Sequence, residues 1–374
     1  MPIPLQRDPE VTAKAVATWL EGVVAGAHDV RISNLCAPPT SGFSNETILA
    51  DASWTDADGQ RRTDELVVRV KPTGYKVFME SDFDLQHRLL GVLDRDSPVP
   101  VPPLLFVEPD PGPLGAPFFV MRKVAGNAAP DRPPYNEEGW LADATPEHRR
   151  LVWRSAIDAL VAVHNIPPET VAFLAKPELG PTGFDQIFEY WRRSFAWAAH
   201  GDEFRIAAAA LDWMESNLPA DRPTSLSWGD ARIGNMLFED GQVRAVVDWE
   251  MLSLGGAEMD LGWWLFLDQF HSFDVPRLEG LGSRAETIEL WEAGTGRAAT
   301  NLDWYEVFAG FRFAIVLMRI EEMFHTFGIP GSDAAPSGPA PAPATTSSRP
   351  EPDNAVLRLL AGKLDIEPPR PLPR

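Results

Sequence analysis

The spacing of apolar residues divides the chain into a first part that predicts strands and a second part that predicts helices. After an amphipathic helical pattern over 9–27, three runs of strand-like composition follow at 30–35, 46–54 and 65–70. Turn signals such as Asp58-Gly59 separate these runs. A further strand is expected over 118–124, after proline-rich connectors at 98–103 and 108–117. The first part therefore predicts a small antiparallel sheet.

Helical periodicity dominates after residue 145. Apolar residues recur with a period near 3.6 over 147–165, 186–200 and 205–218, and prolines follow the first and third of these stretches. A helix is also expected at 78–93, and a buried one at 307–320, where Arg312 and Arg319 interrupt a stretch too short to span a bilayer. We expect most of the thirteen tryptophans to pack between helices.

The segment 226–250, LSWGDARIGNMLFEDGQVRAVVDWE, carries the candidate chemistry. Asp230 and Asn235 precede one apolar run, Asp240-Gly241 marks a tight turn, and Asp248 closes a second apolar run. Phosphoryl transfer needs a carboxylate that orients or deprotonates a hydroxyl, and oxygen ligands that hold magnesium against the phosphates of ATP. Asp230 is the candidate base, and Asn235 and Asp248 are the candidate metal ligands. Turn and capping roles are the alternative for each residue taken singly.

This segment resembles the catalytic region of the aminoglycoside phosphotransferase family, whose pattern is HGDxxxxN followed by a strand and DWE or DxE. The resemblance rests on Gly229, Asp230, Asn235, Asp248 and Glu250. It implies a two-lobed, protein-kinase-like α+β fold and a small-molecule kinase that uses ATP, or another nucleoside triphosphate, with Mg²⁺.

Four further positions bear on the loop that carries this motif. The family's histidine is Trp228 here, and we expect the indole to pack in its place. Arg232 lies inside the loop and is a candidate for neutralising the transferred charge or for bonding to the backbone. The resemblance also implies that Asp260 braces the loop by hydrogen bonds, and that His164 at a helix end is structural.

A loop between the first two predicted strands is the candidate phosphate site. The segment SGFSNET stands where the family has a GxSN-type loop, and a solvent-exposed hairpin turn is the alternative. Its candidate nucleotide-binding residues are Ser41, Gly42, Ser44 and Asn45.

The third strand supplies a cation where kinase-like folds place a lysine against the phosphates. We expect Arg69 in that role, with Lys71 as its competitor and an exposed edge-strand cation as the alternative. The helix that gives the family's glutamate partner has Gln86 at the aligned position. The 118–124 strand resembles the hinge, so backbone groups near Met121 and Lys123 are candidates for binding the adenine edge, although a plain core strand has the same pattern.

Composition excludes several classes of function. The formal net charge of −21 disfavours nonspecific binding to nucleic acid or anionic membranes. Cys36 is the only cysteine, so neither an intrachain disulfide nor a thiolate zinc site forms, and no CxxC, HExxH, GxGxxG or GxxxxGK pattern occurs. Since the beginning of the chain lacks a basic segment followed by an apolar one, we expect a cytoplasmic protein. We also expect a monomer or a homodimer.

The predicted organisation has five parts: an N-terminal lobe at 1–122, a hinge at 123–127, a catalytic lobe at 128–330, a disordered Pro/Ala/Ser linker at 331–353, and a helix with a tail at 354–374. The phosphoryl acceptor is expected to be a hydroxyl of a small molecule. Aminoglycosides, choline-like amines, homoserine and hydroxyacyl thioesters all remain open. A kinase-like protein that binds nucleotide without turnover is the rival function, and a two-carboxylate hydrolase explains the motif less well.

Overall fold

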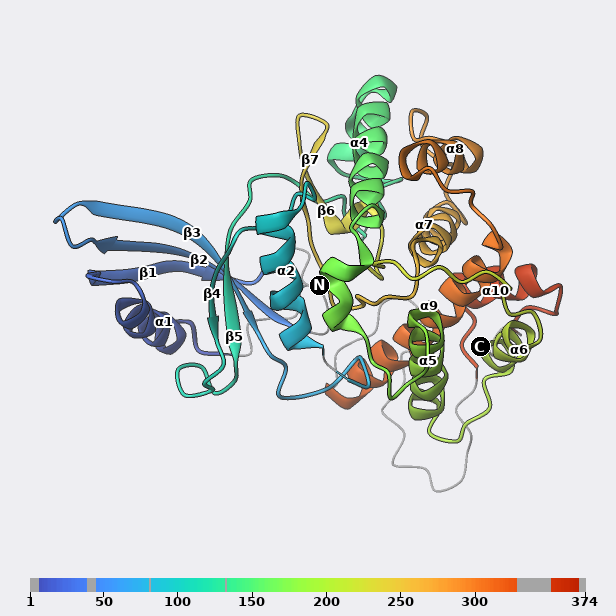
Figure 1. The fold of residues 1–374 in the computed structure, drawn as a ribbon, viewed down its shortest axis with the longest axis horizontal. Helices are drawn as coiled ribbons and strands as arrows, with labels where there is room; N and C mark the ends of the chain where they lie inside the picture. The colour runs from blue at the N-terminus through green and yellow to red at the C-terminus, as the bar shows by residue number, and fades with distance from the viewer. Residues whose placement is uncertain (1–6, 39–44, 81, 132, 328–350, 370–374) are drawn as a thin grey trace. The chain divides into compact units, whose positions relative to one another are not determined.

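The chain forms two compact units (Figure 1). The computed structural model describes residues 7–38, 45–80, 82–131, 133–327 and 351–369. The first unit comprises 1–76, 82–127 and 244–247, and the second comprises 77–81, 128–243 and 248–374. Strands predominate in the first unit and helices in the second, which gives the α+β composition that the sequence predicts.

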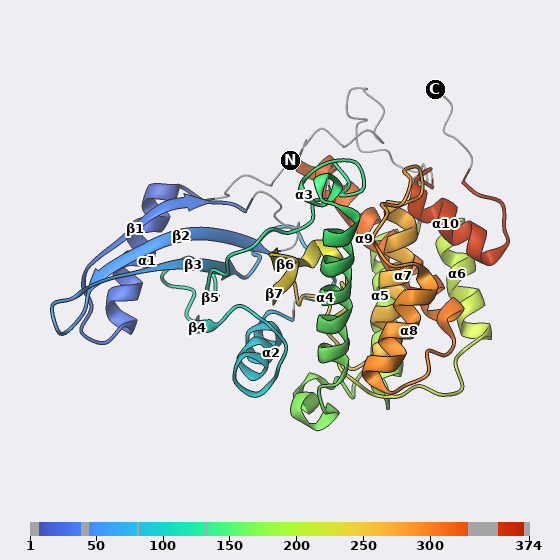
Figure 2. The same cartoon turned by 90° about the horizontal axis from the view of Figure 1, so that it is seen from above.

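A five-stranded antiparallel sheet forms the first unit, in the spatial order β1-β2-β3-β5-β4 (Figure 2). These strands are β1 (His28–Cys36), β2 (Glu46–Thr55), β3 (Arg61–Val70), β5 (Phe118–Arg122) and β4 (Leu104–Glu108). Leu66, Val68 and Val70 are buried on one face of β3, as the period of two in a strand requires. Because β3 is central, the edge-strand alternative for Arg69 is wrong.

Two helices belong to the first unit. Helix α1 (Pro9–Val23) begins at Asp8, whose carboxylate accepts the backbone N–H groups of Glu10 and Val11. Its buried residues Val16, Trp19 and Leu20 pack against the core face of the sheet. Helix α2 (Phe83–Asp96) begins five residues later than the helix predicted over 78–93. The preceding residues belong to the second unit instead, where Phe78 contacts Trp191 with ring centroids 6.3 Å apart.

The second unit is built mainly from helices around a central helix, α9. Helix α9 packs against α5, α6, α7 and α10 (Figure 2), and it is buried on most of its circumference. At Gly262 of α7, a Cβ atom would lie 2.6 Å from Tyr305 of α9, so only glycine permits this close approach. The helices of this unit are α3 (Trp140–Asp143), α4 (Pro146–His164), α5 (Gly183–Ala199), α6 (Arg205–Ser216), α7 (Ala257–His271), α8 (Arg284–Thr295), α9 (Leu302–Phe327) and α10 (Ala355–Leu364), with 3₁₀ turns η1 (Pro168–Leu174) and η2 (Ile233–Asn235).

A tight hairpin follows the candidate catalytic loop, as the sequence predicts. Strands β6 (Met236–Glu239) and β7 (Gln242–Val246) pair with each other. Asp240 and Gly241 connect them with φ angles of 51° and 76°. Two successive left-handed residues are typical of the type I′ turn, which matches the twist of a two-residue hairpin.

The C-terminal helix α10 docks onto its own chain. Its apolar face contacts α6, α7 and α9, and Val356, Leu357 and Leu360 are buried. Lys363 Nζ also lies 2.6 Å from Glu306 Oε2 of α9. Most of the predicted linker, 331–353, lies outside the described residues.

Candidate active site

The loop that carries Asp230 is joined to the segment 251–255 of the second unit. Isolated bridges join Ser225 to Gly255 and Ser227 to Ser253. Gly229 has a φ angle of 96°, and a Cβ atom there would lie 2.1 Å from the carbonyl oxygen of Met251. The close approach and the left-handed backbone both require glycine directly before the candidate base.

Asp260 of α7 braces this loop by hydrogen bonds. Its fully buried carboxylate accepts the backbone N–H groups of Trp228 and Gly229 at 2.6 and 2.8 Å. It also accepts the Ser227 hydroxyl at 2.7 Å. The predicted bracing role of Asp260 is therefore confirmed. Hydrogen bonds from backbone donors to a buried carboxylate fix the loop more rigidly than neutral pairs would.

His164 orients the bracing carboxylate. Its Nε2 lies 3.0 Å from Asp260 Oδ2, while its Nδ1 accepts the indole N–H of Trp291 at 2.8 Å. Since Nδ1 is an acceptor, Nε2 carries the proton and donates to Asp260. His164 is completely buried at the end of α4. The structural role predicted for it is confirmed.

The Asp230 carboxylate is engaged at both oxygens. Oδ1 accepts the indole N–H of Trp263 at 2.8 Å. Oδ2 accepts the Asn235 amide at 2.6 Å and Arg232 Nε at 3.1 Å. The side chain is 17% exposed, so solvent reaches it despite these contacts. An accessible carboxylate fixed in one orientation suits a group that positions a substrate hydroxyl.

Arg232 lies between two carboxylates. Its Nε contacts Asp230, and its Nη1 lies 2.5 Å from Asp131 Oδ1. Burial alone lowers the pKa of Arg232, but the two carboxylates outweigh this effect and raise the pKa above its usual value. The guanidinium therefore stays charged beside the candidate base. The sequence left two roles open for Arg232, neutralising transferred charge or bonding to the backbone. Its hydrogen bonds within the described residues go to carboxylate side chains, and its role toward transferred charge stays a prediction.

The amide of Asn235 is turned so that its nitrogen faces Asp230. Nδ2 donates to the Asp230 backbone carbonyl at 3.1 Å as well as to its carboxylate. This network fixes the orientation of the amide and leaves Oδ1 as the acceptor atom of the side chain. Amide and carboxylate oxygens are ligands that Mg²⁺ prefers, so the donor set of Asn235 and Asp248 fits the ion that the motif implies.

Trp228 replaces the family's histidine and makes a hydrogen bond of its own. The buried indole donates Nε1–H to the carbonyl oxygen of Asp248 at 3.2 Å, and its ring lies 5.8 Å from that of Trp249. Asp248 has a φ angle of 63°, which is unusual for a residue other than glycine. The expectation that an indole packs in this place is confirmed. It ties the loop before Asp230 to the backbone of Asp248.

The structure describes only some of the predicted nucleotide-binding residues of the first unit. Ser41, Gly42 and Ser44 lie outside the described residues, and Asn45 is buried just before β2. Arg69 is half-buried on β3, on the strand face opposite Val68 and Val70, and donates Nη1–H to Thr47 Oγ1 at 3.0 Å. Its assignment to the phosphates stays a prediction.

The candidate hinge residues lie at the end of β5. Met121 is buried opposite Val67 of β3. Lys123 donates its backbone N–H to the Glu65 carbonyl at 2.8 Å, and its ammonium lies 2.5 Å from the Glu65 carboxylate. The backbone N–H of Lys123 is thus used by the sheet. The backbone carbonyl of Lys123 is therefore its remaining candidate group for binding the adenine edge, and that contact stays a prediction.

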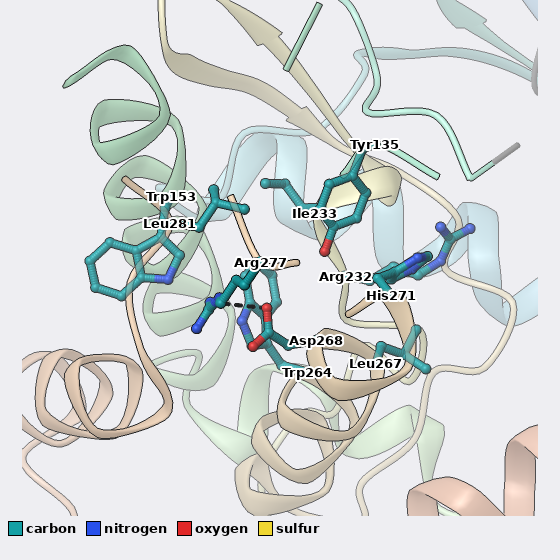
Figure 3. Close-up of a pocket in the computed structure, with 10 residues that line it drawn as sticks. All are labelled: Tyr135, Trp153, Arg232, Ile233, Trp264, Leu267, Asp268, His271, Arg277 and Leu281. Carbon is teal, nitrogen blue, oxygen red and sulfur yellow. Dashed lines mark hydrogen bonds and ion pairs between the residues drawn. The ribbon is translucent and has the colours of Figure 1, made fainter. Parts of the chain in front are cut away.

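A small cavity lies beside the catalytic loop (Figure 3). Its volume is about 20 Å³, room for about one water molecule. Arg232 and Tyr135 line it, and Asp268 forms an ion pair with Arg277 at 3.0 Å. Burial raises the pKa of Asp268 to about 6. Burial likewise lowers the pKa of His271, another lining residue, to about 4.

Sequence reasoning missed three residues that contact the loop: Trp263, Asp131 and Arg312. Trp263 reaches Asp230 from 33 positions away, and Asp131 reaches Arg232 from 101 positions away. No local spacing marks such contacts. Within the described ranges, no helix is long and apolar enough to cross a membrane.

Among proteins of known sequence, the chain is similar to the probable acyl-CoA dehydrogenase IBR3 of Arabidopsis thaliana. The two are 26% identical over 271 residues, which make up 67% of this chain and 32% of that protein. The chain thus spans about a third of this relative's length.

Solved structures show the same fold. A putative aminoglycoside phosphotransferase from Ralstonia eutropha JMP134 superimposes with a TM-score of 0.62 at 22% identity, covering 86% of this chain and 91% of that one. A thermostable mutant of aminoglycoside phosphotransferase APH(4)-Ia, in a ternary complex with ADP and hygromycin B, gives a TM-score of 0.51 at 15% identity over 83% and 93% of the two chains. The predicted two-lobed, kinase-like α+β fold is confirmed.

The model of the phosphotransferase enzyme family matches residues 36–299. This range includes the braced loop, its hairpin and Asp260, together with most of the sheet of the first unit. The protein belongs to the phosphotransferase enzyme family.

Proposed function

We propose that this protein transfers the γ-phosphoryl group of ATP, with magnesium, to a hydroxyl group of a small molecule. The observation that carries the proposal is the state of Asp230. Its carboxylate is accessible, held at both oxygens, and mounted on a loop that a buried aspartate braces. Such preorganisation is what a group that orients an attacking hydroxyl requires.

Asn235 and Asp248 would hold the magnesium ion, which when bound neutralises charge on the phosphates. The Asn235 amide nitrogen is occupied by Asp230, so the oxygen is the atom left to bind a cation. The Trp228 indole fixes the Asp248 backbone in its left-handed conformation. Arg232 remains positively charged beside Asp230, and we assign it to stabilising negative charge that develops on the transferred group.

Nucleotide binding is assigned to the first unit. Arg69 would contact phosphate oxygens, because a half-buried cation in a central strand gains from an anionic ligand. Asn45 and the neighbouring Ser41, Gly42 and Ser44 would add donors, and the Met121–Lys123 backbone would bind the adenine edge. The ADP in the APH(4)-Ia complex supports a nucleotide ligand. A cytoplasmic location, where ATP is available, belongs to the same proposal.

The acceptor has two candidate classes with support. Hygromycin B in the APH(4)-Ia complex favours an aminoglycoside-like compound. The relative named as a probable acyl-CoA dehydrogenase favours a hydroxyacyl thioester, because that protein contains a region similar to this chain within a longer sequence. A binding protein without turnover is less well supported, since binding alone needs neither the fixed carboxylate of Asp230 nor the charged Arg232 beside it.

The test is a screen for ADP release with MgATP and candidate acceptors. The panel includes aminoglycosides, choline-like amines, homoserine and hydroxyacyl thioesters. One acceptor class should stimulate release, and Asp230→Ala should lower that rate by at least about a hundredfold while nucleotide binding is retained. Release that no hydroxyl compound stimulates, or that Asp230→Ala leaves unchanged, would contradict the proposal.

A further inference from the structure

Trp263 contacts the candidate base directly. Its indole, on α7, is buried and donates Nε1–H to Asp230 Oδ1 at 2.8 Å. The Asn235 amide holds the other oxygen. Arg232 Nε also donates to that oxygen, so Oδ2 has two donors whereas the only donor to Oδ1 among the described residues is Trp263. Loss of the indole N–H would therefore leave Oδ1 without its hydrogen bond and loosen the orientation of the carboxylate.

Arg312 of α9 lies against the face of the same indole. Its guanidinium carbon is 4.5 Å from the Trp263 ring centroid and 5.0 Å from that of Phe308. Its Nη1 lies 3.4 Å from the carbonyl oxygen of Gly229, the residue before Asp230. The side chain is 1% exposed, and burial lowers the pKa of Arg312 to about 10.

Arg312 uses only part of its hydrogen-bonding capacity. Its Nε and Nη2 atoms are buried and have no hydrogen-bond partner among the described residues. A buried charge that is not fully paired costs folding free energy, and an apolar residue of similar volume is often neutral or stabilising in its place. A cation over an aromatic face withdraws electron density from the ring, which makes the indole N–H a stronger donor.

We propose that Trp263 and Arg312 are positioning residues that together fix the Asp230 carboxylate. Trp263 holds Oδ1 by its N–H. Arg312 strengthens the indole as a donor and also holds the Gly229 carbonyl in place. The consequence for turnover rests on the proposed phosphotransferase function, whereas the hydrogen bond and its polarisation do not. Loss of either residue leaves the nucleotide-binding groups in place and disturbs the orientation of the base.

Kinetics of conservative variants test the consequence for turnover. Trp263→Phe keeps an aromatic ring and removes the N–H, so kcat should fall about 10- to 100-fold with little change in the KM for ATP. Trp264→Phe is the matched control, because its indole is the next in the helix and lines the cavity of Figure 3. Equal kcat values for the two variants would overturn the inference for Trp263.

Arg312→Met separates positioning from stability. Because it removes a buried and incompletely paired charge, the thermal midpoint should stay the same or rise while kcat falls at least about 5-fold. A lower midpoint with kcat unchanged would make Arg312 a stabilising residue and overturn its part in the proposal. Arg312→Lys, which keeps the charge, should retain more activity than the methionine variant.

A substrate-free measurement separates this inference from the proposed function. In protein with ¹⁵N-labelled tryptophan, the indole resonance that disappears in Trp263→Phe is that of Trp263. Its proton should move upfield in Asp230→Asn, where the charged acceptor is lost, and in Arg312→Met, where polarisation is lost. A resonance unmoved by Asp230→Asn would overturn the hydrogen bond itself. If these shifts occur but no acceptor is phosphorylated, the proposed function fails while the arrangement stands.

Discussion

Replacement of Asp260 by asparagine should uncouple the catalytic loop from α7. The substitution keeps the size of the side chain but turns one of two carboxylate oxygens into a donor. Oδ2 accepts from the Trp228 backbone and from His164, and Oδ1 accepts from the Ser227 hydroxyl and the Gly229 backbone. The NH₂ group of the asparagine therefore faces hydrogen-bond donors in either orientation of the side-chain amide.

The two orientations differ in cost. An amide nitrogen at the Oδ2 position would face the N–H at His164 Nε2. That nitrogen cannot become an acceptor, because Nδ1 of the same ring accepts from Trp291. At the Oδ1 position it meets the Ser227 hydroxyl, which rotates to accept, and the Gly229 N–H, which cannot. The second orientation is thus preferred, and it leaves one buried backbone donor without a partner.

The magnitude follows from these contacts. An orphaned backbone N–H costs about 1–3 kcal/mol, and the remaining bonds each lose about 1 kcal/mol of charge assistance, partly offset because no charge is buried. A net loss of about 3 kcal/mol corresponds to a thermal midpoint lower by about 6–12 °C in a unit of this size. Because the loop also loses its fixed geometry, kcat should fall at least about a hundredfold.

Differential scanning calorimetry and ADP release measure the two effects. Ser227→Ala is the control, since Asp260 then keeps its two backbone donors and His164, and the expected loss is about 1 kcal/mol. A midpoint for Asp260→Asn within about 1 °C of the wild type, together with wild-type kcat, would refute the reasoning about the brace.

Three further variants test other contacts. Trp228→Phe removes the N–H that the Asp248 carbonyl accepts, so calorimetric titration should show magnesium-dependent nucleotide affinity weaker by about tenfold; unchanged affinity would exclude this role. Asp131→Asn removes one charged partner of Arg232, so kcat should fall by no more than about fivefold, as expected of a part-exposed pair; a larger loss would give Asp131 a direct part in turnover. For Asp268, the folded pKa of about 6 exceeds the unfolded value, so folding takes up a proton; the thermal midpoint of the wild type relative to Asp268→Asn should rise as pH falls from 7 to 4, and a fall would contradict the sign.

The parts of the site that the sequence predicts are those whose chemistry is local. Asp230 and Asn235 lie on one short loop, and Asp240-Gly241 has a backbone conformation that few other residue pairs adopt. Asp260 could be placed only through the family resemblance, because its contacts with the loop cross 31 to 33 positions.

Contacts between distant elements were not predictable in the same way. The many tryptophans predict helix packing, which describes the Trp263 ring but not its N–H, because donor direction depends on how α7 meets the loop. The strand β4 is short and lies between proline-rich segments, so its alternation is weak. The sequence predicts too early a start for α2, because Phe78 packs in the second unit and no local pattern shows this contact.

We propose that Asp230, Asn235 and Asp248 belong to a magnesium-dependent nucleotide site. Its most direct test is the thermal midpoint of the wild type and of Asp248→Ala with ATP, with and without Mg²⁺. The wild-type midpoint should rise more with MgATP than with ATP alone, and Asp248→Ala should lose that excess. A wild-type midpoint that no nucleotide shifts, or an excess that survives in Asp248→Ala, would contradict it.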